Sequence, residues 1–264
     1  MSFETLNLSI GSDGVGRVVL DRPDVRNAFN EQMIDDIYRA FRQLSADETA
    51  RLVTLTGAGK AFSAGADLSM MQAVAAYSEQ ENVEEGLRLA AMLQAVHECP
   101  KPTVALVNGP AIGGGVGLVA ACDIAIASSA AVFAFSEVRL GLIPAVISPF
   151  VLSAIGARQA QRYFLTAERF GADEAARIGL VHRVVDAEAL TEAGADMVKA
   201  LLACGPKAQA AAKALIMSEA GAPIDAEQRA RLAQSIAGMR ASAEGQDGIG
   251  AFLEKRKPTW MTGS

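Results

Sequence analysis

The fold of this chain is decided by one stretch, Lys101-Pro-Thr-Val-Ala-Leu-Val-Asn-Gly-Pro-Ala-Ile-Gly-Gly-Gly-Val-Gly-Leu-Val-Ala-Ala-Cys-Asp123. Residues 103–107 have the Val- and Leu-rich composition of a buried strand, and Asn108-Gly109-Pro110 then turns the chain. Gly113-Gly114-Gly115 leads into an apolar helix that we expect from about 116 to 121. Glycines at the start of a helix leave backbone N–H groups unpaired and unshielded. The stretch therefore predicts a site for negative charge, either a standing anion or one formed during a reaction.

Two nucleotide-binding motifs resemble this glycine run. A phosphate-binding P-loop requires a Lys followed by Ser or Thr at its end, but the next lysine is Lys199, which excludes that motif. Residues 115–120 match the relaxed dinucleotide fingerprint, and Glu137 follows at about the expected distance of 20 residues. That fingerprint begins at the end of a strand, however, and here residues 108–114 intervene, which disfavours it. Close helix packing alone is a further explanation of the glycines.

A second loop of small residues supports the reactive interpretation. Residues 60–68, Lys-Ala-Phe-Ser-Ala-Gly-Ala-Asp-Leu, follow an apolar strand expected at 52–56. Ala64-Gly65-Ala66 presents bare backbone, and Asp67 is placed to cap a following helix. Two backbone donors from two separate loops are suited to grip a carbonyl oxygen as it becomes an oxyanion.

The whole set of motifs resembles the crotonase family, also called the enoyl-CoA hydratase/isomerase family. The resemblance covers essentially the whole chain. It is carried by motifs that occur in this order: Arg22-Pro23, Asn27-Ala28, Phe62-Ser-Ala-Gly-Ala-Asp67, Asn108-Gly109, Gly113-Gly-Gly115, Cys122-Asp123, Phe135-Ser-Glu137, Gly141-Leu-Ile-Pro144, Gly179-Leu-Val181 and Phe252-Leu-Glu-Lys-Arg256. The resemblance implies an α/β fold, a crotonase-type spiral of repeated ββα units over residues 1–200. It also implies a C-terminal helical region, 201–264, that packs against neighbouring subunits to make trimers and hexamers. A helical cap on the same chain is the alternative.

Glu137 is the candidate acid–base residue. It follows an apolar strand at 132–135 and precedes Val138 and Leu140, so burial is expected to raise its pKa toward neutrality. An ion-paired or capping role, with Arg139 as partner, is the alternative. The resemblance implies catalysis by Glu137, and it implies that the backbone N–H groups of Ala64 and Gly114 are the oxyanion donors. By matching positions, it also implies that coenzyme A lies along Asp24, Val25, Arg26, Ala28, Ala66, Asp67, Leu68, Phe252 and Lys255.

The chain departs from the family's two-glutamate hydratases at Gly117, where those enzymes carry a first Glu. A single carboxyl serves either hydration of an enoyl-CoA or the proton shift of an enoyl-CoA isomerase. Thioester binding without turnover is a third possibility. The local sequence around Gly113 and Glu137 looks similar to the bacterial 3-methylglutaconyl-CoA hydratase branch, which belongs to leucine and acyclic-terpenoid breakdown. The acyl chain itself is not determined by these motifs.

Composition excludes several other classes of function. The chain has 264 residues, 51% of them hydrophobic, and a net charge of −6 with no long basic run, which argues against nucleic acid as a partner. Its three cysteines form no pattern, which predicts neither disulfides nor a metal site, and His97 and His182 are expected to be structural. No stretch is long and apolar enough for a membrane span, so we expect a cytoplasmic protein. No permanently bound cofactor is expected, since coenzyme A enters as part of the thioester substrate.

The remaining pattern predicts strands and helices in alternation. A hairpin is expected from residues 3–10 and 15–21, followed by a helix to about Leu44 that Asn27 or Asn30 caps. Residues 68–99 read as helical with a break near Tyr77-Ser78. From Glu188 onward the sequence is Ala-rich and helix-forming.

Overall fold

A six-stranded sheet forms the centre of the core in the computed structural model, which describes residues 2–262. Its first two strands form the predicted antiparallel hairpin, and every later neighbour pair is parallel. Parallel neighbours need crossover connections, and here helices supply most of them. The strands, in their order across the sheet, are β1 (Leu6–Ile10), β2 (Val15–Leu20), β3 (Leu52–Gly57), β4 (Thr103–Val107), β6 (Ile124–Ser128) and β9 (Arg183–Val185).

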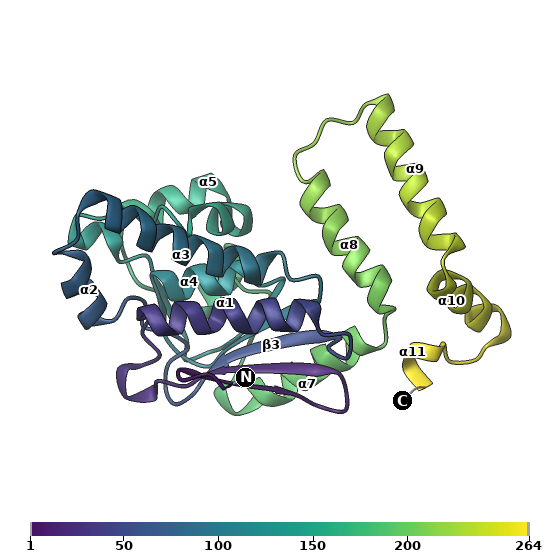
Figure 1. The fold of residues 1–264 in the computed structure, drawn as a ribbon, viewed down its shortest axis with the longest axis horizontal. Helices are drawn as coiled ribbons and strands as arrows, with labels where there is room; N and C mark the ends of the chain where they lie inside the picture. The colour runs from purple at the N-terminus through teal and green to yellow at the C-terminus, as the bar shows by residue number, and fades with distance from the viewer. Residues whose placement is uncertain (1, 263–264) are drawn as a thin grey trace.

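Helices α1 (Glu31–Ala46) and α3 (Glu79–His97) lie together over the sheet (Figure 1). The buried side chains of α1 recur every three or four residues, as a helix with one apolar face requires: Met33, Ile34, Ile37, Ala40, Phe41 and Leu44. Asn30 caps this helix by accepting from the N–H of Met33 at 2.9 Å. The other expected cap, Asn27, has a different role, described below.

A second, three-stranded sheet places the glycine-rich stretch beside the segment that carries Glu137. Its strands are β5 (Ala111–Ile112), β7 (Val132–Ala134) and β8 (Phe170–Gly171). Ile112 is in register with Ala134, so the end of β5 lies beside the end of β7. The 3₁₀ turn η2 (Glu137–Leu140) follows β7 almost at once. β5 and β8 have two residues each, which is too short for an alternation pattern to predict them.

Helix boundaries follow the predictions closely, with one informative shift. The expected break near Tyr77 separates α2 (Leu68–Val74) from α3, and Ser78 forms a capping box with Glu81 at the start of α3. Helix α4 runs from Gly114 to Ala121, two residues earlier than expected. Gly114 itself therefore stands in the first turn, where backbone N–H groups lack intrahelical acceptors.

The rest of the core is formed by α5 (Ser148–Thr166), α6 (Ala172–Arg177) and α7 (Leu190–Leu202), with short 3₁₀ turns η1 (Pro23–Val25) and η3 (Ala187–Ala189). Helix α5 is interrupted at Gly156, whose φ of +69° is not helical. The predicted division of the chain at residue 200 falls inside α7, and α7 packs on strands β3, β4 and β6. The C-terminal helical region thus separates from the core after α7 ends.

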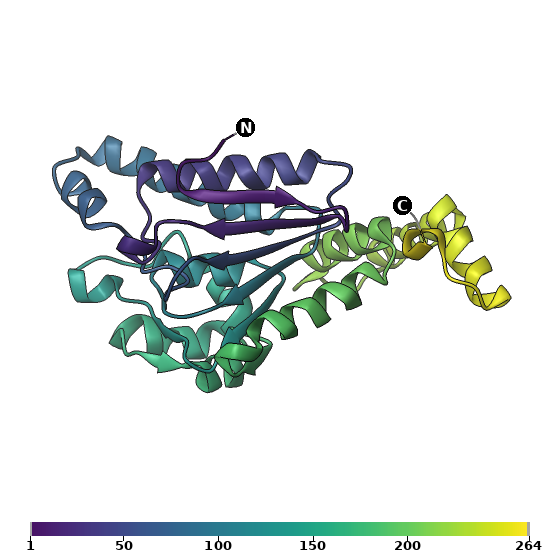
Figure 2. The same ribbon diagram turned by 90° about the horizontal axis from the view of Figure 1, so that it is seen from below.

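The C-terminal region is an arm of four helices, α8 (Pro206–Glu219), α9 (Ala226–Ala241), α10 (Ala243–Glu254) and α11 (Thr259–Thr262). It leaves the core at the end of the sheet opposite α2 (Figure 2). Polar contacts from several parts of the arm hold it to the core. Lys213 Nζ of α8 pairs with Asp123 Oδ2 at 2.8 Å, and the Arg51 guanidinium donates to the carbonyl oxygens of Cys204 at 2.8 Å and Trp260 at 2.9 Å. The expected α/β core with a C-terminal helical region is thus present.

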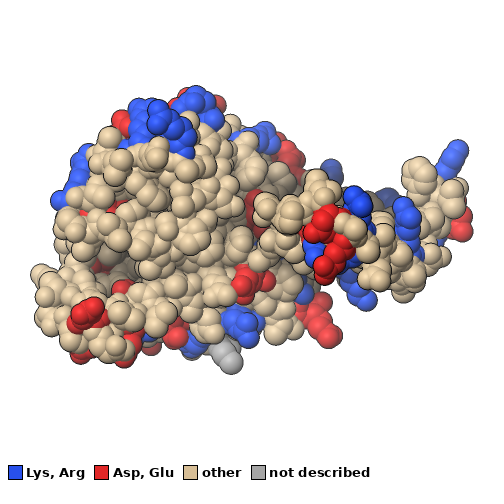
Figure 3. All heavy atoms as spheres, turned by 90° about the horizontal axis from the view of Figure 1, so that it is seen from above, with Lys and Arg blue, Asp and Glu red and all other residues tan. Residues whose placement is uncertain are grey.

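Charged side chains are unevenly distributed over the surface. In Figure 3, Lys and Arg gather along one edge of the core, while most of that face of the core carries no charge. Among residues 2–262, no helix combines the length and the apolar character that crossing a membrane would require.

Candidate active site

Three backbone segments meet at the start of α4. The N–H groups of Phe62 and Ser63 both donate to Pro110 O at 3.1 Å, and Ile112 N–H donates to Ser63 O at 2.9 Å. Gly113 N–H donates to Ala134 O at 2.8 Å. The two small-residue loops that the sequence singled out are therefore joined to each other and to the strand that precedes Glu137.

Gly65 lets the two loops approach this closely. Its φ is +84°, and a Cβ at this position would lie 2.8 Å from Ile112 O and 3.9 Å from Gly113 Cα. A side chain at Gly65 would thus be strained and would also collide with backbone. The amides that follow this contact on either side belong to Ala66 and Gly114.

The structure corrects one of the two predicted oxyanion donors. Ala64 N–H donates to Arg26 O at 2.9 Å, so it is already satisfied and is not free to bind a substrate oxygen. The free amide of this loop belongs to Ala66, for which no acceptor is found within residues 2–262. Gly114 N–H likewise has no acceptor in the described part of the chain. The prediction of Ala64 was wrong because the sequence pattern indicates only that this loop exposes its backbone. It does not indicate which N–H of the loop points outward.

Glu137 lies directly over the glycine run. Its Oε1 atom is 3.1 Å from the point where a Gly113 Cβ would stand, so a side chain there would crowd the carboxyl. Its Oε2 atom is buried and has no hydrogen-bond partner among the described residues. Burial raises the pKa of the Glu137 carboxyl, with its own backbone N–H as a smaller opposing influence. The predicted direction of the pKa shift is therefore reproduced. Arg139 is exposed, and within residues 2–262 no ion pair joins it to this carboxyl.

Most of the predicted coenzyme A residues lie along one edge of this site. Asp24, Val25 and Arg26 are exposed on η1 and the residue after it, and Leu68 is 78% exposed at the start of α2. Ala28 is buried, and Phe29 N–H donates to Gly65 O at 2.6 Å, which brings the Asp24–Ala28 segment against the Ala66–Leu68 segment.

Asp67 is occupied with structural contacts. Its carboxylate caps α2 by accepting from Ser69 N–H at 2.8 Å and from the Ser69 hydroxyl at 2.7 Å, and it pairs with Arg22 at 2.9 Å. Hydrogen bonds from Ser69 hold the pKa of Asp67 below its usual range, and Arg22 adds to the effect. Its side chain therefore orients the loop. Its backbone is engaged as well, since Asp67 N–H donates to Phe29 O at 2.8 Å and Asp67 O accepts from Met71 N–H at 2.9 Å.

Asn27 is a structural residue whose importance the sequence showed only as part of a motif. It is fully buried at a φ of +55°, and its Oδ1 accepts from Arg22 N–H at 2.9 Å. Its Nδ2 donates to the carbonyl oxygens of Ala58 at 2.9 Å and Ala61 at 2.8 Å. These bonds hold the Asp24–Ala28 segment on the loop that carries Ala66.

Phe252 and Lys255 do not join this cluster within one chain. Both belong to the end of α10, Phe252 is 83% exposed, and the arm lies across the core from α2 (Figures 1 and 2). A role of these two residues at the site described here would require a second copy of the chain.

The two histidines have structural environments. His182 Nδ1 accepts from Ala125 N–H at 3.1 Å, which links β6 to the segment that precedes β9. His97 stacks edge-on with Phe150 at a centroid distance of 5.3 Å. Neither contact involves Glu137 or the two free amides.

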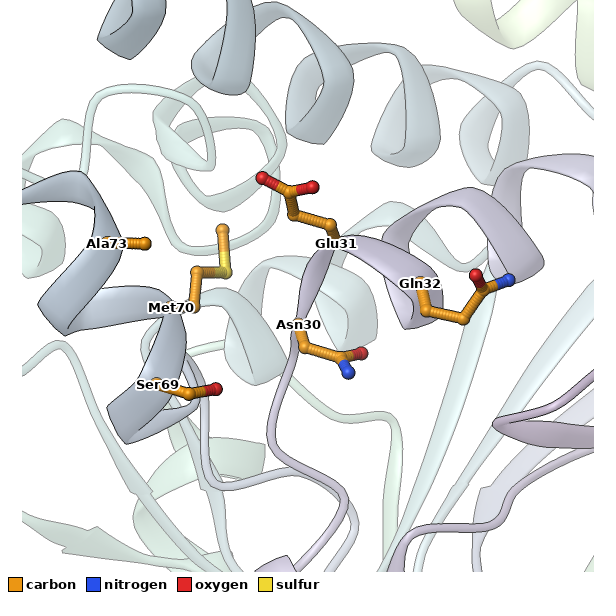
Figure 4. A pocket seen from close by; sticks show the side chains of 6 residues that line it. All are labelled: Asn30, Glu31, Gln32, Ser69, Met70 and Ala73. Atoms are coloured by element: carbon orange, nitrogen blue, oxygen red, sulfur yellow. The ribbon is translucent and has the colours of Figure 1, made fainter. Parts of the chain in front are cut away.

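Two surface pockets lie outside the cluster. One is the gap between the start of α1 and helix α2, where Met70 and Glu31 point toward each other (Figure 4). Its polar groups already have partners, because Asn30 caps α1 and Glu31 accepts from the Tyr77 hydroxyl at 2.9 Å. The other is a groove between the β1–β2 hairpin, α7 and Trp260. Glu137, Ala66 and Gly114 line neither pocket.

Comparisons with known proteins agree with this arrangement. Residues 11–263 match the family model described as enoyl-CoA hydratase/isomerase. The solved structure of an enoyl-CoA hydratase from Shewanella pealeana superposes with a TM-score of 0.94 at 41% identity, over 98% of this chain and 96% of that one. Crotonyl-CoA hydratase of Syntrophomonas wolfei is 32% identical over 99% of this chain and all of its own length, and hydroxycinnamoyl-CoA hydratase-lyase of Pseudomonas fluorescens is 34% identical over 80% and 77%. On this family match and these identities over nearly the whole chain, the protein belongs to the enoyl-CoA hydratase/isomerase family, the crotonases.

Proposed function

We propose that this protein is an enoyl-CoA hydratase, which adds water across the 2,3-double bond of an acyl-CoA thioester. The observation that carries the proposal is the pairing of two unbonded amides, on Ala66 and Gly114, with one carboxyl over Gly113 whose buried Oε2 atom has no hydrogen-bond partner among the described residues. The amides suit a carbonyl oxygen that gains negative charge, and the carboxyl suits proton transfer near neutral pH. Coenzyme A enters as part of the substrate.

In the proposed reaction the thioester oxygen accepts hydrogen bonds from Ala66 and Gly114. Glu137 takes a proton from a water molecule as the water oxygen bonds to C3, and the electrons of the double bond move onto the thioester oxygen as an enolate. Glu137 then returns its proton to C2, which restores the carbonyl and completes the addition of one water. Loss of one oxyanion donor of this kind typically costs about 2.7–4 kcal/mol of transition-state stabilisation.

The presence of one carboxyl also supports an isomerase. Glu137 would take a proton from C2 of a 3-enoyl thioester and deliver it to C4, through a dienolate whose oxygen accepts from the same two amides. Absorbance separates the possibilities: hydration of a 2-enoyl-CoA removes the absorbance of the conjugated thioester, isomerisation of a 3-enoyl-CoA creates it, and binding without turnover changes neither. A protein that binds enoyl-CoA but changes neither absorbance would contradict both enzymatic proposals.

For the acyl chain we propose a branched substrate, with 3-methylglutaconyl-CoA as the first compound to test. The terminal carboxylate of that chain requires a cation or water beside it, and Arg139 is exposed on the turn that begins with Glu137. A panel of crotonyl-CoA, 3-methylcrotonyl-CoA and 3-methylglutaconyl-CoA, assayed with the wild type and Arg139→Ala, tests this. If the ratio of kcat/KM for the carboxylated and uncarboxylated chains is the same in both proteins, Arg139 does not recognise the carboxylate.

We propose that the arm acts in a homotrimer or hexamer, in which Phe252 and Lys255 reach the coenzyme A site of a neighbouring copy. The exposed position of Phe252 and the distance of the arm from α2 in both views support this. Removal of residues 245–264 is expected to weaken coenzyme A binding and to loosen the assembly. A truncated protein that keeps its mass by light scattering and its affinity for coenzyme A would contradict this role.

A further inference from the structure

The backbone at Gly117 packs so closely against Ile147 that a side chain at residue 117 would collide with it. It stands one turn after Gly113 in α4, and a Cβ built on it would lie 2.2 Å from Ile147 Cγ2 and 2.8 Å from Ile147 Cβ. Leu93 Cδ1 of α3 would be 3.6 Å away on the next side. Carbon atoms in contact are normally separated by roughly 3.5–4.0 Å, so any side chain at 117 must push Ile147 outward by about 1 Å or more.

Ile147 is also the point where the segment that begins with Glu137 returns to the core. It is 3% exposed, it precedes α5, and its carbonyl oxygen accepts from Val151 N–H at 3.1 Å. Between these ends, Leu140, Leu142 and Ile143 are exposed by more than half. The segment 137–147 thus contacts the start of α4 at its beginning, over Gly113, and at its end, on Gly117, with the exposed residues 139–143 between them.

Both contact points belong to the same short helix, because Gly113 is the N-cap of α4 and Gly117 lies within it. The helix is rigidly placed, because Val116, Leu118, Val119 and Ala121 are all buried in the main core. A displacement of Ile147 away from α4 is therefore passed along the segment to η2, since α4 itself cannot retreat into a close-packed interior.

We propose that Gly117 is a positioning residue for the reaction: its lack of a side chain seats Ile147 on α4 and so holds the Glu137 carboxyl over Gly113. This inference rests on the proposed function, which assigns proton transfer to Glu137. It also means that a second carboxyl cannot be accommodated at residue 117 while Ile147 keeps its place.

The surroundings of Glu137 make its ionisation a sensitive measure of its position. Helix α4 contains no charged residue, and the charged residue nearest in sequence, Arg139, is exposed on the same turn. Burial is what raises the pKa of Glu137, and no charged side chain contributes to that shift. If the segment moves outward, water reaches the carboxyl and its pKa falls toward the ordinary range.

The test compares Gly117→Ala with a matched control on the other side of the sheet. Gly194→Ala overpacks in a similar way, because a Cβ there would lie 2.9 Å from Leu106 Cδ1. We expect Gly117→Ala to lower kcat by roughly 10²-fold, the typical effect of about 1 Å of misplacement, with a smaller change in KM. The acidic limb of its pH–rate profile should move to lower pH. Gly194→Ala should lower the melting temperature without moving that limb.

A compensating change separates positioning from general damage. Gly117→Ala combined with Ile147→Ala removes the 2.2 Å clash with Ile147 Cγ2 and leaves only the 2.8 Å approach to the Cβ of residue 147. In this double variant kcat should therefore recover in part, and the limb should return part of the way toward its wild-type position. The inference is overturned if Gly117→Ala turns over within a few-fold of wild type with an unchanged limb. It is also overturned if the double variant is folded and recovers neither quantity.

Failure of the proposed function would look different. In that case the wild type itself would show no turnover that depends on Glu137. The ionisation of Glu137 can then still be followed by infrared difference spectroscopy of the carboxyl band, with Glu137→Gln as the reference that assigns it. A pKa equal in Gly117→Ala and wild type would overturn the positioning inference by this route as well.

Discussion

The core and the arm of this protein differ in the burial of their apolar side chains: the core buries most of the large ones, and the arm exposes many of them. In the core, large side chains such as Phe41, Phe62 and Phe133 are fully buried, and the site lies where three buried segments meet. In the arm, α8 buries no residue, and α9 and α10 bury only Gln228 and Ala251. Its exposed apolar side chains include Leu215, Ile216, Ile224, Ile236, Ile249, Phe252 and Leu253. This difference supports the proposals that the core contains the catalytic site and that the arm packs against another copy of the chain.

The largest expected effect belongs to Glu137→Gln, which tests whether the core contains the catalytic group. This change keeps the size and polarity of the side chain but removes its ionisable group, so turnover should fall by roughly 10²–10⁴-fold, as is typical for loss of a general acid–base group. Binding of the thioester should survive through the amides of Ala66 and Gly114. Initial-rate assays measure the change in kcat, and equilibrium titration with a substrate analogue measures thioester binding separately.

Glu85→Gln is the matched control for that prediction. Glu85, on α3, is also a half-buried carboxyl whose pKa burial raises, and its Oε1 is likewise unpartnered among the described residues. Its removal should leave kcat unchanged. Equal losses of kcat in both variants would mean that each buried carboxyl acts through the stability of the fold. The position of Glu137 over Gly113 would then have no special role in turnover.

The second prediction concerns the scaffold of the core. Asn27→Ala removes three hydrogen bonds from a fully buried site and places alanine at a positive φ. Each buried group left unsatisfied costs roughly 1–3 kcal/mol. Denaturant unfolding should therefore show a loss of several times the effect of Asn7→Ala, which removes a single exposed hydrogen bond to Asp21. Similar losses in the two variants would show that the Asp24–Ala28 segment does not depend on Asn27.

The third prediction is that the raised pKa of Glu137, which suits proton transfer, makes the folded protein less stable as the pH rises. Because the folded state raises the pKa of this carboxyl, its favourable contribution is present at low pH, while it is protonated, and is lost as the pH rises through the raised value. Glu137→Gln should accordingly gain melting temperature relative to wild type as the pH increases. Glu81→Gln should show the opposite trend, since bonds from Ser78 lower the pKa of Glu81 and its contribution is lost as the pH falls. A pH-independent difference for Glu137→Gln would contradict this.

The sequence predicted the order of elements in the core because apolar periodicity and turn residues are local signals. The hairpin, the break before Ser78 and the paired loops at Gly65 and Gly113 all follow from such signals. It also predicted the burial of Glu137 from its apolar neighbours. The resemblance supplied the spiral topology, which residue pattern alone showed only as a recurrence of strand, loop and helix.

What the sequence did not provide depends on contacts between distant residues. The choice of Ala66 over Ala64 is decided by the hydrogen bond from Ala64 to Arg26, 38 positions away in the chain, and no local pattern encodes it. The two-residue strands β5 and β8 exist only through their pairing with β7. The contact of Gly117 with Ile147 likewise became visible only when α4 and α5 were brought together.

The smallest predicted effect belongs to the arm. Lys255 ends α10, and a lysine that approaches a phosphate of coenzyme A at an exposed site contributes about 1 kcal/mol or less, because water and salt screen the charge. Lys255→Gln should therefore raise KM only several-fold, leave kcat unchanged, and lose its effect at high ionic strength. Lys257→Gln removes a neighbouring charge outside the predicted contact and should change neither constant. If both substitutions raise KM equally, the arm attracts the substrate by its overall charge. If neither does, Lys255 makes no contact with coenzyme A, and the arm then contributes to assembly alone.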